Sequence, residues 1–193
     1  MDKLKVGFVV MAAGLSSRYG RNKLLAELEG RSLISRALDA VPIEKLDRVA
    51  VVTRFPEVLA LAEARGFESV WNDHPEEGVS LTIRLGLERL CDMDAAVFMT
   101  GDQAWLSRAS VSAMVDFCRE YPGHIISMSY AGERGSPSIF PSALFPELDA
   151  LRGDTGGCVV IRRHEDILRC FDVADAAELR DIDHPADLRP FAC

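Results

Sequence analysis

An alternation of short apolar strands with amphipathic helices is the feature of this sequence that most constrains its fold. The first run, residues 5–12, is β-rich and apolar without alternation, as expected of a strand that is buried on both faces. Further strand-like runs lie at 48–53, 67–71, 94–100 and 125–130, and helical patterns lie at 32–41, 56–65, 80–90 and 108–119. This rhythm predicts an α/β fold in three layers, with a doubly wound, mostly parallel sheet between helices.

Local signals agree with these boundaries, and the pattern changes after Gly132. Ser32 is placed to cap the first helix, and Pro56 and Gly66 are placed to begin and end the second. Beyond Gly132 we expect a short strand, a helix, a glycine-rich turn, two terminal strands and a short helix, at 138–140, 142–151, 153–157, 167–173, 178–182 and 185–188. No link is long enough to separate two domains, so residues 1–193 are expected to form a single one.

The charge distribution narrows the range of ligands. The formal net charge of −8 argues against a nucleic-acid-binding protein, which normally needs a basic face. Residues 1–36 carry seven basic and three acidic side chains, which leaves 15 basic and 27 acidic ones in residues 37–193. A basic island in an acidic chain suggests a small polyanionic ligand, although a chance cluster of surface cations would give the same count.

Other broad classes lack their signatures. The longest apolar run, residues 6–13, is far below the ~20 residues that a membrane span needs, and a folded strand explains it better than a leader sequence. The five cysteines form no Cys-x-x-Cys pair, and the four histidines show no i, i+4 pair. We therefore expect a cytoplasmic protein with reduced thiols, without a zinc site and without a role at a membrane.

The most informative segment, residues 11–23, reads Met-Ala-Ala-Gly-Leu-Ser-Ser-Arg-Tyr-Gly-Arg-Asn-Lys. It begins where the first strand ends, at the edge where open α/β sheets bind ligands. Small residues that let backbone N–H groups approach an anion come first, at Ala12, Ala13 and Gly14. Hydroxyl and cationic donors suited to a triphosphate follow, at Ser16, Ser17, Arg18 and Lys23. The spacing fits neither a Walker loop nor a dinucleotide fingerprint, and a plain glycine turn with surface cations is the alternative.

This segment resembles the signature of the MobA-like nucleotidyltransferases, and five further blocks resemble that family in the expected order. They are Asn-Asp-His-Pro-Glu-Glu-Gly-Val-Ser-Leu-Thr-Ile-Arg-Leu-Gly at 72–86, Thr-Gly-Asp-Gln at 100–103, Gly-Ser-Pro-Ser-Ile-Phe at 135–140, Gly-Asp-Thr-Gly-Gly at 153–157 and Asp-Ile-Asp-His-Pro-Ala-Asp-Leu at 181–188. The six blocks cover nearly the whole chain, and they imply a Rossmann-like nucleotidyltransferase fold.

Ala13 in place of a second glycine, together with Gly-Asp-Gln at 101–103, resembles the molybdenum-cofactor cytidylyltransferase branch of the family. The resemblance implies that a phosphate of an acceptor attacks the α-phosphate of CTP, or of another NTP, and releases pyrophosphate with the help of Mg²⁺. The implied acceptor is a molybdopterin-type molybdenum cofactor, and a molybdoenzyme is a candidate recipient of the product.

The resemblance also implies roles for particular residues. Arg18 and Lys23 would balance the charge of the triphosphate and of the leaving pyrophosphate. Asp102 would hold Mg²⁺ through a hard oxygen ligand, and Asp181 would be a second carboxylate on the same ion. The other residues implied in nucleotide binding are Ala12, Ala13, Gly14, Ser16, Ser17 and Ser80, and those implied in acceptor binding are Asp154, Gly156 and Asp183.

Structural explanations remain open for several of these residues. Asp102 could cap a turn and Ser80 a helix, whereas Asp154, Asp181 and Asp183 could end a helix or fix turns. Three residues also depart from the family pattern: Ala104 replaces a proline beside the metal loop, which would loosen it, His184 replaces a threonine, and Thr82 replaces a serine. The alternatives are therefore transfer to another acceptor, such as a sugar or alcohol phosphate, or a nucleotide-binding accessory protein without turnover.

Overall fold

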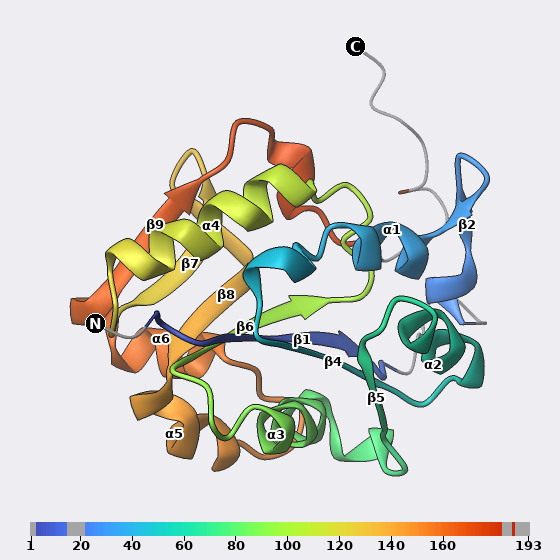
Figure 1. Cartoon of the computed structure of the whole chain (residues 1–193), viewed down its shortest axis with the longest axis horizontal. Coiled ribbons are helices and arrows are strands. Elements are labelled where there is room, and N and C mark those ends of the chain that lie inside the picture. Colours follow the sequence, from blue (N-terminus) through green and yellow to red (C-terminus); the bar gives the residue numbers. More distant parts are fainter. Residues whose placement is uncertain (1–2, 15–21, 183–186, 188–193) are drawn as a thin grey trace.

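The computed structural model describes residues 3–14, 22–182 and 187, and a seven-stranded sheet forms its centre (Figure 1). Across the sheet the strands lie in the order β5 (Glu68–Trp71), β4 (Arg48–Thr53), β1 (Val6–Ala12), β6 (Ala95–Thr100), β8 (Glu133–Pro141), β7 (Ile125–Tyr130) and β9 (Leu168–Asp172). Neighbouring strands pair in parallel except at β8, which is antiparallel to both β6 and β7. The mostly parallel sheet predicted from the sequence is confirmed.

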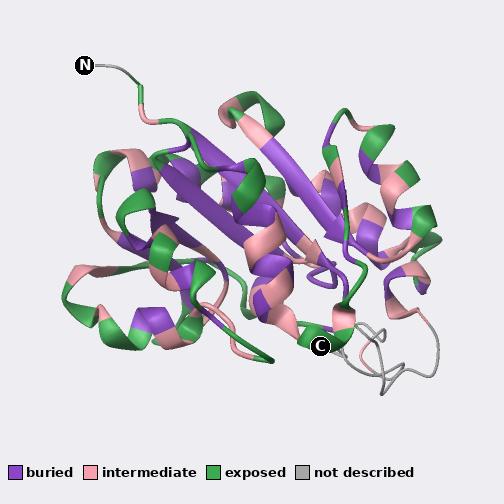
Figure 2. Ribbon diagram, turned by 90° about the horizontal axis from the view of Figure 1, so that it is seen from below, coloured by how far each residue is buried: buried purple, intermediate pink, exposed green. Residues whose placement is uncertain are grey.

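Helices cover both faces of the sheet. On one face lie α1 (Leu33–Asp39), α2 (Pro56–Glu63) and α4 (Arg108–Glu120), and on the other lie α3 (Val79–Arg89), α5 (Phe145–Asp149) and α6 (Cys158–Arg163). Alternate residues of β1 face the two layers, since Phe8 belongs to the first apolar core and Val9 to the second. The central strands β1, β4 and β6 are accordingly buried, whereas the helices expose one side (Figure 2). The predicted three-layer arrangement is therefore confirmed.

Local signals set several of the boundaries as predicted. The Oγ of Ser32 accepts a hydrogen bond from the backbone N–H of Ser35 at 3.3 Å, so Ser32 is the N-cap of α1. Pro56 occupies the first turn of α2, and Gly66 follows that helix with a φ of +74°. Strands β4 and β7 have the bounds expected from the sequence.

The second half of the chain differs from the prediction in several elements. Strand β8 starts at Glu133 and is longer than the predicted 138–140, and helix α6 was not predicted. The predicted helix 142–151 is a 3₁₀ turn, η4 (Ser142–Leu144), followed by the short α5, which begins next to Pro146. The short hairpin of β2 (Glu27–Leu28) and β3 (Arg31–Ser32) was also missed.

The predicted strand at 178–182 is wrong. The chain forms a 3₁₀ helix there instead, η6 (Ala176–Leu179), and 180–182 are irregular. The carboxylate of the buried Glu178 accepts hydrogen bonds from the backbone N–H of Ser107 and from the Oγ of Ser110, both at 2.9 Å. These contacts hold the segment at the start of α4, and the side chain of Leu179 packs against the first apolar core instead of extending the sheet. The helix predicted at 185–188 lies outside the described residues, apart from position 187.

Within the described part of the chain, no helix combines the length and the apolar character that crossing a membrane requires.

Candidate functional site

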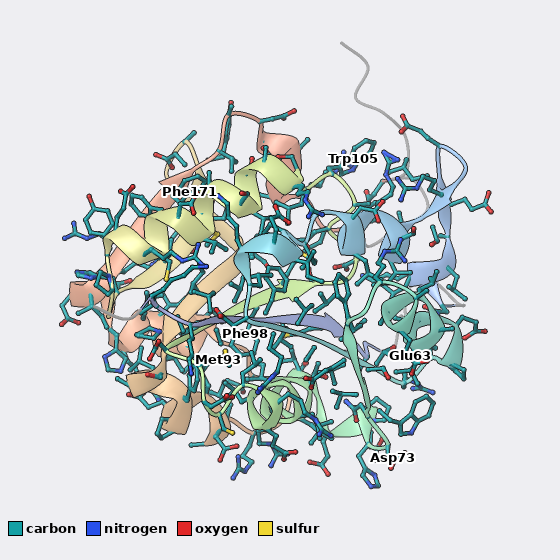
Figure 3. All side chains as sticks on the ribbon, in the orientation of Figure 1. Glu63, Asp73, Met93, Phe98, Trp105 and Phe171 are labelled. Carbon is teal, nitrogen blue, oxygen red and sulfur yellow. The ribbon has the colours of Figure 1, made fainter. Side chains whose placement is uncertain are left out.

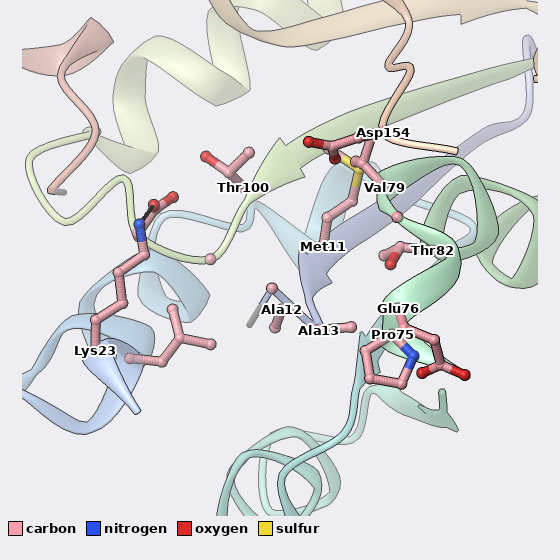
Figure 4. A pocket seen from close by; sticks show the side chains of 15 residues that line it. Met11, Ala12, Ala13, Lys23, Pro75, Glu76, Val79, Thr82, Thr100 and Asp154 are labelled. Carbon is pink, nitrogen blue, oxygen red and sulfur yellow. Dashed lines mark ion pairs between the residues drawn. The ribbon is translucent and has the colours of Figure 1, made fainter. Parts of the chain in front are cut away.

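A cleft of ≈ 480 Å³ opens at the carboxyl ends of β1 and β6, beside the start of α3, and we refer to it as the first cleft (Figure 4). The predicted residues that line it are Ala12, Ala13, Gly14, Lys23, Asp102 and Asp154. Lys23, which forms an ion pair with Asp102, lies on one side, and Asp154 lies across the cleft beside Val79. The topology therefore brings together residues from four separate sequence blocks. Ser16, Ser17, Arg18 and Asp183 lie outside the described residues.

Asp102 is the most constrained charged residue of the first cleft. It is only 8% exposed, and its Oδ2 lies 2.6 Å from the Nζ of Lys23. Its Oδ1 is buried and has no hydrogen-bond partner. A buried carboxylate oxygen without a partner is costly, so this atom is suited to a cation that arrives with a ligand.

Asp181 lies near the same strand end. Its Oδ1 accepts a hydrogen bond from the Oγ1 of Thr100 at 3.2 Å, and Thr100 is the last residue of β6, two positions before Asp102. Mg²⁺ is commonly bound through one or two carboxylates together with substrate phosphates. Among the described residues, no cluster of three or more His, Cys, Asp or Glu side chains that could hold a metal ion is present.

A small apolar cluster lies behind both carboxylates, and we refer to it as the third cluster. It consists of Ala26, Leu28, Leu33, Ala104 and Ile182, with Trp105 against it. Each of three cluster members follows a charged residue of the site closely in the chain: Ala26 follows Lys23, Ala104 follows Asp102, and Ile182 follows Asp181. The packing of the cluster therefore restrains the three segments that carry these charged residues.

The loop after Asp102 is held firmly, contrary to the expectation drawn from Ala104. Ala104 is only 6% exposed, and its carbonyl accepts a hydrogen bond from the Nε of Arg36 at 3.4 Å. The guanidinium of Arg36 also lies 5.7 Å from the ring centroid of Trp105, beside α1 (Figure 3). Arg36 and Trp105 therefore restrain a loop that lacks the usual proline.

The entrance to α3 depends on a glycine. Gly78 has a φ of +83° and a ψ of −174°, a conformation that is nearly restricted to glycine, and a Cβ at this position would lie 2.5 Å from the backbone of Gly153. The backbone N–H of Ser80 donates to the carbonyl of Gly153 at 3.2 Å. The alternative prediction that Ser80 caps helix α3 is wrong. The N-cap of α3 is Gly78, and the Oγ of Ser80 is buried without a hydrogen-bond partner.

Glu76 adds a negative charge to the rim of the first cleft. A hydrogen bond with its own backbone, followed by one with His74, keeps the pKa of this carboxyl below its ordinary value. The Nδ1 of His74 lies 3.1 Å from the Oε1 of Glu76. Thr82, on the same side, accepts a hydrogen bond from the buried Asn72 at 3.3 Å, so the threonine that replaces a serine keeps a hydroxyl contact.

A second cavity of ≈ 540 Å³ adjoins the first cleft and shares Met11, Val79 and Thr100 with it. Of the predicted residues, Gly156 and Asp181 line this second cavity. The predicted site therefore divides into two neighbouring spaces, with Asp102 on one and Asp181 on the other.

Residues 8–167 match the family model described as the MobA-like NTP transferase domain. The chain belongs to the MobA-like NTP transferase family. This transferase is 29% identical over 191 residues to the purine catabolism protein PucB of Bacillus subtilis (strain 168), a match that covers 93% of this chain and 92% of PucB.

Solved structures share the fold of this MobA-like transferase. The crystal structure of Rv0371c from Mycobacterium tuberculosis H37Rv aligns with a TM-score of 0.78 and 24% identity, covering 95% of each chain, and another structure of Rv0371c is a complex with manganese. A CMP:2-keto-3-deoxy-manno-octonic acid synthetase complexed with CTP aligns with a TM-score of 0.73 and 13% identity, covering 97% of this chain and 95% of the synthetase. These likenesses establish the fold.

Several residues that line the two spaces of this MobA-like transferase were not predicted as site residues from the sequence. Thr100 carried a usable signal, since it ends a predicted strand directly before Gly-Asp. Arg134 and Arg162 also line the second cavity, and neither was predicted as a site residue. Glu76 lies within the 72–86 block, beside the glycine that begins α3.

Proposed function

We propose that residues 1–193 act as one nucleotidyltransferase domain that moves CMP from CTP to a phosphorylated acceptor, a molybdopterin-type molybdenum cofactor, and releases pyrophosphate. The observation that carries this proposal is the buried, unpartnered Oδ1 of Asp102 beside Lys23 in a cleft at strand ends. This combination provides one site for a divalent cation and one positive charge for the phosphates that the cation accompanies.

In the proposed reaction an oxygen of the acceptor phosphate forms a bond with the α-phosphorus of CTP. The bond from that phosphorus to the oxygen that bridges to the β-phosphate breaks, and pyrophosphate leaves with the electron pair. Bound Mg²⁺ would supply charge neutralisation for the phosphates. The manganese and the CTP of the two solved relatives are the ligand classes that we extend to this chain.

The residues of this chain bind and orient the reactants. Ala12, Ala13 and Gly14 follow β1 without bulky side chains, so their backbone can approach the nucleotide closely. Asp102 and Asp181 would hold the cation, and Lys23 would move from Asp102 to the triphosphate as the ion arrives. Arg18, Ser16 and Ser17 are proposed to contact the phosphates, and Ser80 the nucleotide.

The choice of CTP and of the molybdenum cofactor rests on the sequence resemblance described above. Ala13 and the Gly-Asp-Gln block favour a cytidylyltransferase over a guanylyltransferase. The accessory-protein alternative was suggested by Ala104, which replaces a proline beside Asp102. Because Arg36 donates a hydrogen bond to the carbonyl of Ala104, this loop favours a catalyst over an accessory protein.

The test is the release of pyrophosphate in the presence of Mg²⁺, measured with CTP, GTP, ATP and UTP, each with and without the molybdenum-loaded pterin cofactor. We expect release with CTP only when the cofactor is present. Equal use of CTP and GTP would refute the base assignment. Binding of CTP with no release for the cofactor would refute the acceptor assignment.

A further inference from the structure

Glu178 is a buried carboxylate that the proposed reaction does not use. It is only 8% exposed, and it lies in η6, on the segment that follows β9. We refer to residues 174–182 as the strap, and Figure 1 shows it beside the first turn of α4. Because a buried carboxylate is costly unless it is hydrogen bonded, the contacts of Glu178 identify what this side chain stabilises.

The carboxylate of Glu178 joins the two chain segments that carry the proposed metal ligands. Its Oε2 accepts a hydrogen bond from the backbone N–H of Ser107, and its Oε1 accepts one from the Oγ of Ser110, both at 2.9 Å. Ser107 lies five residues after Asp102, and Asp181 lies three residues after Glu178. One side chain therefore fixes the end of the β6–α4 loop, which begins with the first carboxylate, and the part of the strap that leads to the second.

Two further contacts connect the same segments through β8. A Cβ added to Gly135 would lie 3.2 Å from the Cδ2 of Leu179, so the strap lies directly against the backbone of β8. The carbonyl of Ser136, the next residue of β8, accepts a hydrogen bond from the Nε2 of Gln103 at 2.7 Å. Because Gln103 directly follows Asp102, the β6–α4 loop, β8 and the strap form a closed ring of contacts.

The second carboxylate needs such an anchor because it is not part of the sheet. The stretch that follows η6 is irregular, and Asp181 is placed there by side-chain contacts, including its hydrogen bond from Thr100 at 3.2 Å. Hydrogen bonds to a carboxylate are stronger than those between neutral groups, so the two that Glu178 accepts restrain the strap firmly. Glu178 is not among the described residues that line the first cleft or the second cavity, so it acts on the cation only through these segments.

The separation of two carboxylates affects which cation they bind well. Mg²⁺ requires a nearly ideal octahedral geometry, whereas the larger Ca²⁺ accepts more oxygen ligands in flexible arrangements. Side chains that orient the ligands of a metal commonly contribute about 10- to 100-fold to its affinity. A contact that fixes the two ligand-bearing segments against each other therefore favours the smaller cation.

We infer that Glu178 is a positioning residue that sets the separation of Asp102 and Asp181, and that it thereby makes the site select Mg²⁺ over Ca²⁺. This inference rests on the proposed function, which assigns both aspartates to the cation. The hydrogen bonds of Glu178, rather than its charge, provide the selectivity.

The test measures by isothermal titration calorimetry how tightly the full chain binds a non-hydrolysable α,β-methylene analogue of CTP. The analogue is supplied as its Mg²⁺ complex, as its Ca²⁺ complex, or free of metal in the presence of EDTA. Glu178→Leu removes both hydrogen bonds, whereas Glu178→Gln removes the charge and can keep both contacts through its amide oxygen and nitrogen. Ser110→Ala removes one of the two contacts, and its matched control is Ser112→Ala, because Ser112 is a half-buried serine of the same helix.

We expect Glu178→Leu to weaken binding of the Mg²⁺ complex by about tenfold and binding of the Ca²⁺ complex by no more than about threefold. Binding of the metal-free analogue should be the same as in the native chain. Glu178→Gln should stay within about twofold of the native chain for all three forms of the analogue. Ser110→Ala should weaken binding of the Mg²⁺ complex by about threefold, and Ser112→Ala should leave it unchanged.

Equal losses for the Mg²⁺ and Ca²⁺ complexes in Glu178→Leu would overturn the inference, since they would reflect a general loss of structure or of negative charge. A loss in Glu178→Gln as large as in Glu178→Leu would overturn it too. If Glu178→Leu does not fold, the comparison of Ser110→Ala with Ser112→Ala decides, and equal effects of these two variants reject the inference. A native chain that binds the Mg²⁺ complex no more tightly than the metal-free analogue would instead refute the proposed function, so the two failures can be told apart.

Discussion

The first cleft and the second cavity are neighbours, but they are built in different ways. The first cleft opens at the ends of β1 and β6, and its charged side chains, Lys23, Glu76, Asp102 and Asp154, all come from outside the strands of the sheet. The second cavity is lined by side chains from within β6, β7 and β8, where Phe98, Ser127 and Ser138 lie on one face of the sheet. The charged groups of the first cleft therefore lie beyond the strand ends, whose positions the topology fixes, whereas the shape of the second cavity depends on the identity of side chains along the strands.

The largest effect that would test this division is expected for Asp102→Asn. The substitution removes the negative charge from the oxygen pair that faces Lys23, so transfer should fall by about a thousandfold or more. The matched control is Asp154→Asn, because Asp154 lies in the same cleft across from Lys23, and this substitution should reduce transfer much less. Comparable losses for both variants would contradict the special role of Asp102.

Gly78→Ala should damage both spaces at once. The substitution places a Cβ 2.5 Å from the backbone of Gly153 at a φ that glycine tolerates best, so the free energy of unfolding should fall by about 3 kcal/mol. Gly66→Ala is the matched control, because it has a φ of +74° and nothing within 4 Å of the added Cβ, and it should cost about 1 kcal/mol. Urea unfolding measures both costs. Equal losses of unfolding free energy in the two variants would mean that the turn at Gly153 shifts to accommodate the added Cβ.

Ile182→Val tests whether the third cluster positions the carboxylates. The lost methylene should lower the free energy of unfolding by about 1 kcal/mol and shift Asp181, so the Mg²⁺ concentration for half-maximal transfer should rise several-fold. Ile126→Val, in the first core, should cost similar stability and leave the Mg²⁺ dependence unchanged. Binding of Mn²⁺ followed by electron paramagnetic resonance, with the CTP analogue present, provides a second readout. A shift in both variants would show a general loss of stability instead.

The smallest effect is expected far from both spaces, at Asp39. Burial raises the pKa of this carboxyl, but hydrogen bonds and charges from Arg31 and Arg65 outweigh burial, so the pKa lies below its ordinary value. The carboxylate thus stabilises the fold above the ordinary carboxyl pKa, and this stability is lost as the pH falls through the lowered value. Asp39→Asn should cost less than about 1 kcal/mol at pH 7, with the cost disappearing in acid, as measured by urea unfolding across pH.

Asp73→Asn is the control for Asp39→Asn, since Asp73 is exposed and makes no ion pair within the described residues. Neither substitution should change the binding of CTP. A change in this affinity caused by Asp39→Asn would show that α1 transmits strain to the site.

The parallel half of the sheet could be predicted because each of its strands is a short apolar run between turn signals. Strand β4 was found with the predicted bounds for this reason. The beginning of β8 could not be predicted, because Gly135 and Pro137 are residue types that strands disfavour. Helix α6 was missed because it begins directly after a glycine-rich turn and contains Val159, Val160 and Ile161, which are β-branched.

The site was predictable to a similar degree. The proximity of Asp102 and Lys23 could be predicted because both belong to glycine-bearing blocks that follow strands at the same edge of the sheet. The placement of Asp181 beside Thr100 could not be read in the same way, because it depends on the contact of Glu178 with the start of α4 and on the burial of Ile182. Both are tertiary contacts between segments far apart in the sequence.

The reversed direction of β8 has a consequence for how such enzymes can diverge. Every other strand of the sheet ends at the edge where the first cleft lies, but β8 begins there, so the turn that joins it to β7 at Ala131 and Gly132 lies at that edge too. Insertions or exchanges in this turn, and in the first residues of β8, would remodel the wall that carries Arg134 and Ser136 while leaving Lys23 and Asp102 in place. An ancestral enzyme with this topology could have acquired a new acceptor through changes in one hairpin without rebuilding its nucleotide chemistry.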